Sequence, residues 1–258
     1  MLKKNGYSLC TVVYGRKLSK FRECVGSWID NKNTDDFEIN ISCNGLDEDL
    51  VKYFSDLEKK YDFINVFYFS KNLGAAKGLN TSFLASKYRY IVKLDDDIII
   101  PNANKDWLQK LSTCLDSDHR VDIVTGVCFA AGPVMPYTVK KLGLEMEIEK
   151  YIGVPFEKFD MGYRNGNFLK FNEEMKIRIE EHAQYLRENN DGYQHLHQGL
   201  LRMMGCLMMT YHETFRVHGV LKENFGLHGQ DDIEFDRRLR SHGREDLTDT
   251  SLYYYHWV

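Results

Sequence analysis

The chain has 258 residues, 43% hydrophobic and 28% charged, which suits one large α/β domain or two small ones. The formal net charge is −4, and the longest runs of basic residues are pairs. The sequence therefore has no basic patch typical of nucleic-acid-binding proteins, and only a locally basic groove stays open as an alternative. No apolar stretch is long enough to cross a bilayer, no signal-peptide core follows the N-terminus, and the six cysteines have no paired spacing. We therefore expect a cytoplasmic protein with reduced, mostly buried thiols.

Strand and helix patterns alternate through the first hundred residues. β-rich or apolar runs predict strands at 7–14, 37–43, 64–69 and 88–94. Apolar residues at helical spacing predict helices between them, at 17–29, 50–61 and 72–86. This alternation predicts a mostly parallel sheet with right-handed crossovers, which is an α/β fold.

The alternation lapses in the second half of the chain. A helix at 107–115 and a strand at 121–130 precede a segment at 132–198 that holds three of the four prolines and many aromatic residues. Met175, Ile179, Ala183 and Leu186 predict an amphipathic helix within 172–190, so we interpret 132–198 as an insertion or lid. A buried strand or strand pair at 200–210 follows, and a last aromatic strand at 252–257 carries His256.

Three consecutive carboxylates, Asp95, Asp96 and Asp97, follow the predicted strand at 88–94. Each ionised group at the end of a core strand loses water and repels its neighbours, and a divalent cation removes that cost. Hard oxygen ligands suit Mg²⁺ or Mn²⁺, and ligands of open α/β sheets bind at the carboxyl ends of the strands. The alternative is a solvated acidic turn.

A second acidic group, Asp231 and Asp232, follows a glycine-containing loop and opens a predicted helix. Glu234 and Arg238 are four residues apart, as are Asp236 and Arg240, and both pairs have the order that supports a helix. Two aspartates in the first turn can simply cap the helix and interact with its dipole. Two carboxylates after such a loop exceed what capping requires, which favours a functional site.

These pieces, in this order, resemble the GT-A-fold glycosyltransferases, closest to the inverting family 2, over about 7–256 apart from the insertion. The resemblance is carried by Val12-Val13-Tyr14 at the end of the first strand, the Asn72–Asn80 stretch, the aspartate triplet, the 229–243 segment and His256. It implies one domain over 1–258, with a Rossmann-like nucleotide-binding half at 1–101 and an acceptor half at 102–258.

The resemblance also implies roles for individual residues. Asp97 would bind the metal with Asp95 and His256, Asp95 would also lie near the ribose, and Asp232 would be the general base, with Asp231 and Glu234 as the neighbouring acids. Nucleotide-sugar contacts would come from the positions that match the family's donor site: Val13, Tyr14, Arg16, Asn44, Asn72, Gly74, Lys77, Asp95, Asp96 and Arg238.

Two positions depart from the family pattern. The acidic residue usual after the second strand is replaced by Cys43-Asn44, which leaves Asn44 as a candidate substitute for the base contact. The usual Glu-Asp pair is Asp231-Asp232. Lys93 to Asp97 is also similar to the β-1,3-galactosyltransferase families, although the Asn72–Asn80 stretch fits those less well.

The chemistry of glycosyl transfer agrees with this pattern, because a leaving pyrophosphate needs a cation and an attacking hydroxyl needs a carboxylate base. We expect a metal-dependent (Mn²⁺ or Mg²⁺) inverting enzyme that uses a UDP-linked or other nucleotide-sugar donor. The acceptor stays open among a glycan, a lipid-linked carrier, a protein and a modified nucleic acid. The alternatives are a nucleotidyltransferase, for which Tyr14 to Lys17 is too short a phosphate loop, and a non-catalytic nucleotide- or sugar-binding relative.

Other side chains have two interpretations each. His195 and His197 could bind a metal from one face of a strand, and Arg16 or Lys77 could meet a phosphate, although a solvated role suits each. In the insertion, Tyr151, Phe156 and Tyr163 could stack on sugar rings or pack in a core. We predict that the segment 132–198 forms part of the acceptor side and is more mobile than the sheet.

Overall fold

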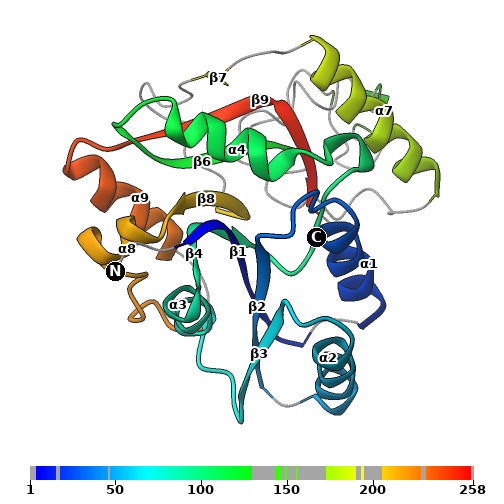
Figure 1. The fold of residues 1–258 in the computed structure, drawn as a ribbon. Helices are drawn as coiled ribbons and strands as arrows, with labels where there is room; N and C mark the ends of the chain where they lie inside the picture. The colour runs from blue at the N-terminus through cyan, green and yellow to red at the C-terminus, as the bar shows by residue number, and fades with distance from the viewer. Residues whose placement is uncertain are drawn as a thin grey trace.

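The computed structural model describes residues 4–15, 18–45, 47–129, 173–189, 193–194, 205–227 and 231–256, and single positions at 143, 145–146, 149 and 155. The fold is a central sheet covered by helices on both faces (Figure 1). This confirms the predicted α/β architecture with a mostly parallel central sheet. Most of the predicted segment 132–198, with His195, His197, Tyr151, Phe156 and Tyr163, lies outside the described residues.

The first half of the chain forms four parallel strands in the order β3-β2-β1-β4. A helix connects each strand to the next: β1 (Lys4–Val13), α1 (Leu18–Asp30), β2 (Phe37–Asn44), α2 (Glu48–Lys60), β3 (Ile64–Phe69), α3 (Ala75–Ala85) and β4 (Tyr88–Leu94). β2 is buried along its whole length, as expected for a strand with helices on both faces. The predicted strand and helix positions of this half are confirmed.

The second half extends the sheet beyond β4 in the order β8-β6-β9-β5, with β8 antiparallel to both β4 and β6. Its elements are β5 (Ile98–Ile99), the 3₁₀ helix η1 (Asn102–Asn104), α4 (Trp107–Asp116), β6 (Val121–Phe129), α7 (Glu173–Asn189), β7 (Tyr193–Gln194), β8 (Leu207–Tyr211), α8 (His212–His218), α9 (Asp231–Ser241) and β9 (Glu245–His256).

Two apolar layers hold the helices on the sheet. On one face, α1, α2 and α4 bury large side chains such as Phe21, Phe54 and Trp107. On the other face, α3, α8 and α9 meet through stacked rings, with Phe215 lying 4.5 Å from Phe83 and 5.2 Å from Phe235 between centroids. Burial of these rings fixes α9 against the sheet, and α9 carries the second acidic group.

α3 packs unusually close to β1 because Gly78 has no side chain. A Cβ at this position would lie 2.6 Å from Val12 Cγ2, and the Gly78 carbonyl accepts a 2.7 Å hydrogen bond from Ser42 Oγ. The predicted glycine-containing stretch therefore sets how closely α3 approaches the sheet.

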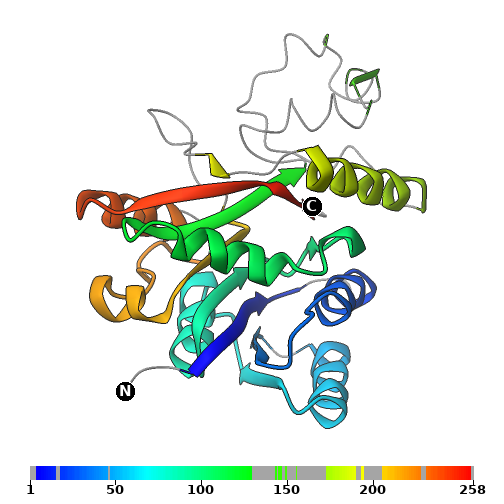
Figure 2. The same cartoon turned by 45° about the horizontal axis from the view of Figure 1, so that its top comes forward.

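α7 is the longest described part of the predicted insertion, and it packs against β9 (Figure 2). Ile179, Ala183 and Leu186 are buried, which confirms the predicted amphipathic helix. Arg187 binds both carboxylate oxygens of Asp106 at 2.6 and 2.8 Å, a bidentate pair that fixes the helix to the segment before α4.

The predicted strand or strand pair at 200–210 is described only from 205 onward, where Gly205 and Cys206 form a turn before β8. The carbonyl oxygens of this turn accept hydrogen bonds from Lys93 Nζ and Asp95 N. One predicted boundary was wrong. β9 begins at Glu245 instead of 252, and polar residues such as Asp246 and Asp249 are buried in it. Periodicity of apolar residues cannot detect a buried strand whose side chains are polar and paired.

All six cysteines are buried and outside disulfides, as predicted. Among the helices of the described ranges, none combines the length and apolarity needed to cross a bilayer.

Candidate functional site

The aspartate triplet lies in the turn between β4 and β5, beside the end of β9. β5 pairs antiparallel with β9 so that Ile98 lies opposite His256, and this register brings the histidine to the triplet. His256 Nε2 lies 3.0 Å from Asp97 Oδ1, and ligand atoms of Asp95, Asp97 and His256 all lie within 4.8 Å of one another. Two carboxylates and an imidazole at this spacing fit a hard divalent cation such as Mn²⁺.

Asp97 and His256 form a buried ion pair. Burial opposes the charged imidazole, but the hydrogen bond to Asp97 and the nearby Cys206, Asp97 and Asp95 outweigh it and raise the pKa of His256 to about 9. The Asp97 side chain is only 1% exposed. A cation that used the His256 nitrogen would have to displace this proton, so binding would release it.

Lys93 connects Asp95 of the triplet with the neighbouring turn at Gly205. This buried side chain donates hydrogen bonds to Asp95 Oδ1 and to the Gly205 carbonyl oxygen. Burial acts against its charge, but Asp95 and, farther away, Asp232 hold the pKa of Lys93 above its ordinary value. Lys93 therefore remains cationic at neutral pH and offsets part of the negative charge around it.

Asp232 lies in the first turn of α9 and packs against the backbone of Gly205. A Cβ on Gly205 would lie 1.9 Å from Asp232 Oδ2, while Asp232 Oδ1 accepts a 2.8 Å hydrogen bond from Ile233 N. Asp231 beside it is buried, and burial raises its pKa, with a further contribution from the Asp232 charge. The two acidic groups of the sequence thus meet on either side of Lys93 and Gly205.

Glu234 and Arg238 face the segment before α9. Glu234 pairs with Lys222 at 2.8 Å and with Arg238 at 3.1 Å, which confirms the predicted pair. Arg238 also donates to the carbonyl oxygens of His218 and Val220 at 2.7 and 2.9 Å. These contacts hold the 218–222 segment on α9, and the catalytic role of Glu234 and the donor contact of Arg238 stay predictions.

Asn44 is bonded to the loop that precedes α3. Its Nδ2 donates to Asn72 Oδ1 at 2.8 Å and to the Gly74 carbonyl at 2.9 Å, and its Oδ1 accepts from Leu73 N at 2.8 Å. Gly74 has φ +91°, and a Cβ there would lie 2.6 Å from the Gly226 carbonyl oxygen. The structure therefore brings Asn44, Asn72 and Gly74 together as one tightly bonded loop.

The Asn72–Asn80 stretch also holds the loop that leads to α9. Ala75 N donates to the Leu227 carbonyl at 3.1 Å. Asn80 exchanges two hydrogen bonds with the backbone of Leu221, at 2.8 and 3.0 Å. The family-like stretch in the first half thus positions the second acidic group.

The remaining predicted donor residues are placed individually. Val13 is buried at the end of β1, and Tyr14 after it is 57% exposed. Lys77 is exposed in the first turn of α3, and Asp96 is buried in the triplet. Arg16 lies outside the described residues.

Lys93 and Gly205 were missed as site residues by the sequence reasoning. A lysine in an otherwise apolar strand directly before three aspartates was the available signal for Lys93. No comparable signal existed for Gly205, because its contacts come from residues more than twenty positions away.

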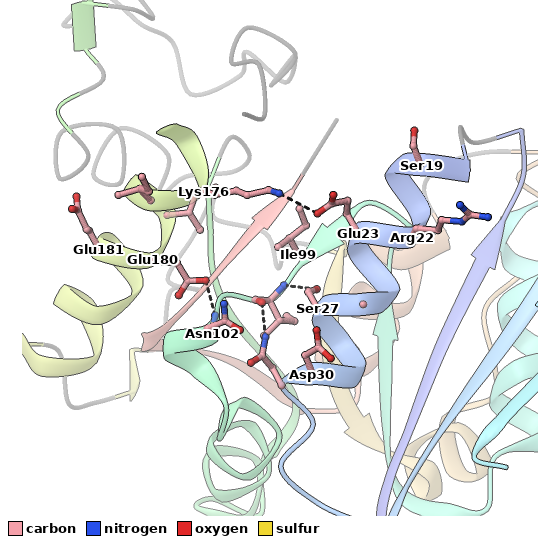
Figure 3. A pocket seen from close by; sticks show the side chains of 15 residues that line it. Ser19, Arg22, Glu23, Ser27, Asp30, Ile99, Asn102, Lys176, Glu180 and Glu181 are labelled. Atoms are coloured by element: carbon pink, nitrogen blue, oxygen red, sulfur yellow. Dashed lines mark hydrogen bonds and ion pairs between the residues drawn. The ribbon is translucent and has the colours of Figure 1, made fainter. Parts of the chain in front are cut away.

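An open cleft of about 800 Å³ lies between α1, the β5–η1 segment and α7 (Figure 3). Ile99, two residues after Asp97, lines it, and most of the other lining side chains are polar. Lys176 spans the cleft from α7 to Glu23 on α1 at 3.3 Å. The cleft therefore joins the predicted insertion to the segment that follows the triplet.

Glycosyltransferases of low sequence identity are among the solved structures with a similar fold. The mannosyltransferase PcManGT from Pyrobaculum calidifontis, in complex with GDP-Man and Mn²⁺, is 13% identical with a TM-score of 0.63, over 99% of this chain and 57% of that one. S. aureus TarS 1-349 is 12% identical with a TM-score of 0.60, over 97% of this chain and 60% of that one. GalNAc-T7 with UDP, GalNAc and Mn²⁺ is 14% identical with a TM-score of 0.61, over 98% of this chain and 44% of that one. This chain thus spans about half of the length of those proteins.

No curated protein matches the sequence. The model of the family described as glycosyl transferase family 2 matches residues 8–192, which is most of the chain. That range includes the β1–β4 half, the Asn72–Asn80 stretch and the aspartate triplet. With the GT-A architecture described above, this match shows that the chain belongs to glycosyl transferase family 2.

Proposed function

We propose that the chain is a metal-dependent, inverting glycosyltransferase that moves a sugar from a UDP-linked donor to an acceptor hydroxyl. The proposal rests on the arrangement of two groups of side chains on either side of Lys93 and Gly205. Asp95, Asp97 and His256 lie on one side, and Asp232 lies on the other. Such an enzyme needs one acidic group for a cation and a separate carboxylate for a base.

Asp95, Asp97 and His256 would hold Mn²⁺ or Mg²⁺, and the ion, when bound, supplies positive charge for the leaving diphosphate. Two structurally similar glycosyltransferases support this choice, since PcManGT was solved with GDP-Man and Mn²⁺ and GalNAc-T7 with UDP, GalNAc and Mn²⁺. Exposed Tyr14 and the bonded loop of Asn72 and Gly74 are the residues that we assign to the nucleotide end of the donor.

Asp232 would act as the general base that takes the proton of the acceptor hydroxyl. Its carboxylate is partly exposed, and it lies against Gly205 while Asp231 is buried. Direct displacement with one base inverts the anomeric configuration.

The acceptor would enter through the cleft between α1 and α7. Sugar hydroxyls could hydrogen-bond to the polar side chains of its lining, such as Ser19, Asp30 and Asn102 (Figure 3). A Cβ on Gly26, which lines the cleft, would meet no atom within 4 Å, so Gly26→Phe would fill space there. We expect this change to weaken acceptor use and leave metal-dependent hydrolysis of the donor intact, which a comparison of the two rates measures.

The test of the function is a screen of nucleotide sugars for metal-dependent hydrolysis, followed by transfer with Asp232→Asn. This change keeps the shape of the side chain and removes the proton acceptor, so donor binding should persist while transfer falls about 10²-fold or more. NMR of the product should show the anomeric configuration opposite to that of the donor. Retained configuration, or normal transfer by Asp232→Asn, would reject Asp232 as the base of an inverting reaction.

The cysteines, all outside disulfides, support a cytoplasmic location, which we propose with the function.

A further inference from the structure

Two buried cysteines lie on the side of His256 that the proposed reaction does not use. Cys128 is near the end of β6, where it pairs in register with Tyr254 of β9, and Cys206 is in the turn before β8. Their Sγ atoms are 3.9 Å apart, and the residues are 0% and 5% exposed. Three segments that are distant in sequence thus bring two thiols together beside the end of β9.

His256 completes this cluster. Ligand atoms of Cys128, Cys206 and His256 all lie within 4.8 Å of one another. The imidazole Nε2 is directed to Asp97, and the other ring nitrogen, Nδ1, is buried without a hydrogen-bond partner among the residues that the structure describes. A buried polar nitrogen of this kind costs free energy unless some group binds it, and an ion is one such group.

We propose that Cys128, Cys206 and His256 form a second metal site, specific for a thiophilic cation of the Zn²⁺ or Cd²⁺ class. Two thiolates bound tetrahedrally at about 2.3 Å from Zn²⁺ have sulfur atoms about 3.8 Å apart. The observed 3.9 Å separation matches this value, whereas a disulfide requires about 2.05 Å. The cysteines therefore need almost no movement to accept such an ion.

The environment of the two sulfur atoms also suits a thiolate-bound cation. Tyr254 Oη lies 3.3 Å from Cys206 Sγ, where a hydroxyl can donate a hydrogen bond to a thiolate. The His256 side chain is 17% exposed, so the cluster has a route for an ion on that side. Soft sulfur ligands select against Mn²⁺ and Mg²⁺, which separates this site from the carboxylate site.

The two sites would compete because they share His256. A neutral imidazole has a lone pair on only one nitrogen, so an ion at Nδ1 and an ion at Nε2 need different tautomers of the ring. Occupation of the thiolate site would therefore weaken cation binding by Asp95 and Asp97, and a cation bound by Asp95 and Asp97 would weaken binding at the thiolate site. An inhibitory effect of thiophilic metal on transfer would follow, a consequence that rests on the proposed function, while metal binding itself does not.

The test is a titration of the reduced, metal-free full chain with Cd²⁺, followed by the ultraviolet absorption of thiolate-to-cadmium charge transfer. We expect one equivalent bound with this absorption. Cys128→Ser and Cys206→Ser should each remove the absorption and weaken binding at least about 10²-fold. Cys114→Ser, at a buried cysteine of α4, is the matched control and should bind like the wild type. Added Mn²⁺ should weaken Cd²⁺ binding in the wild type and not in Asp97→Ala.

Wild-type protein without the absorption, or a Cys128→Ser variant that retains it, would overturn the proposal. A second measurement needs no variant: X-ray absorption of the Zn²⁺-loaded wild type should show two sulfur ligands and one ring nitrogen. A shell of oxygen and nitrogen ligands alone would overturn the proposal even if the serine variants failed to fold.

Discussion

Replacement of Lys93 by methionine tests whether one buried charge holds the two acidic groups together. Methionine keeps the length and apolar stem of the side chain but removes the hydrogen bonds to Asp95 and to the Gly205 carbonyl. A hydrogen bond to a charged group contributes about 1.5–3 kcal/mol. The Asp95 side chain is 36% exposed, so water would replace part of the first bond, and we expect a total loss of about 2–4 kcal/mol.

For a chain of this size, 1 kcal/mol changes the melting temperature by about 2–4 °C. Lys93→Met should therefore melt about 5–12 °C below the wild type at neutral pH by calorimetry or circular dichroism. Lys4→Met is the control, because Lys4 pairs with Asp36 on the surface, where solvent screens the pair and its loss costs little stability.

The pH dependence of this loss has a defined sign. Without the lysine, the buried carboxylate of Asp231 loses a positive neighbour that lowers its pKa, so protonation of Asp231 then restores part of the lost stability. The difference in stability between Lys93→Met and the wild type should narrow as the pH falls from 7 toward 4. A Lys93→Met protein no less stable than Lys4→Met, or a difference that widens at low pH, would refute this role.

Two further changes test the contacts around Asp232. Gly205→Ala would place its Cβ 1.9 Å from Asp232 Oδ2, so we expect its free energy of unfolding to fall by about 1–3 kcal/mol. The control Gly26→Ala lies at an open position and should not share this loss. An unchanged stability of Gly205→Ala would contradict the described packing. Asp231→Asn should stabilise the protein at pH 7, because burial raises the pKa of Asp231 and ionisation of this carboxyl costs stability as the pH rises through that pKa. The gain in stability should vanish near pH 4, where Asp231 is protonated in the folded protein. A gain seen only at acid pH would contradict the burial argument.

The part of the fold that could be predicted from the sequence is the part set by local periodicity. The β1–β4 half alternates strongly between apolar strands and amphipathic helices, so its elements and the position of the triplet at a strand end followed directly. The first turn of α9, with Asp231 and Asp232, was predictable for the same reason, since the i, i+4 pairs continue behind it.

The geometry of the site depends on long-range contacts that no local pattern contains. His256 reaches Asp97 only through the register of β5 on β9, and no local sequence pattern indicates that register. Lys93 stands out as a charged residue in an apolar strand, but its acceptor, the Gly205 carbonyl oxygen, lies 112 positions away in the sequence. Asp246 was not predicted to lie in a strand, because the pattern used to find strands is apolar. In the structure Asp246 is buried, and Arg240 pairs with it at 3.0 Å.

The most direct test of the central claim is the thermal stability of the wild type and Asp97→Ala with UDP, each measured with Mn²⁺ and with EDTA. Ligand binding stabilises the folded protein by mass action, so UDP at 100 times its Kd should add about 2.7 kcal/mol to the wild type when Mn²⁺ is present. The gain should be much smaller with EDTA, and Asp97→Ala should show no difference between the two conditions. A variant that responds to UDP and Mn²⁺ like the wild type would contradict the assignment of the triplet as the metal and donor site.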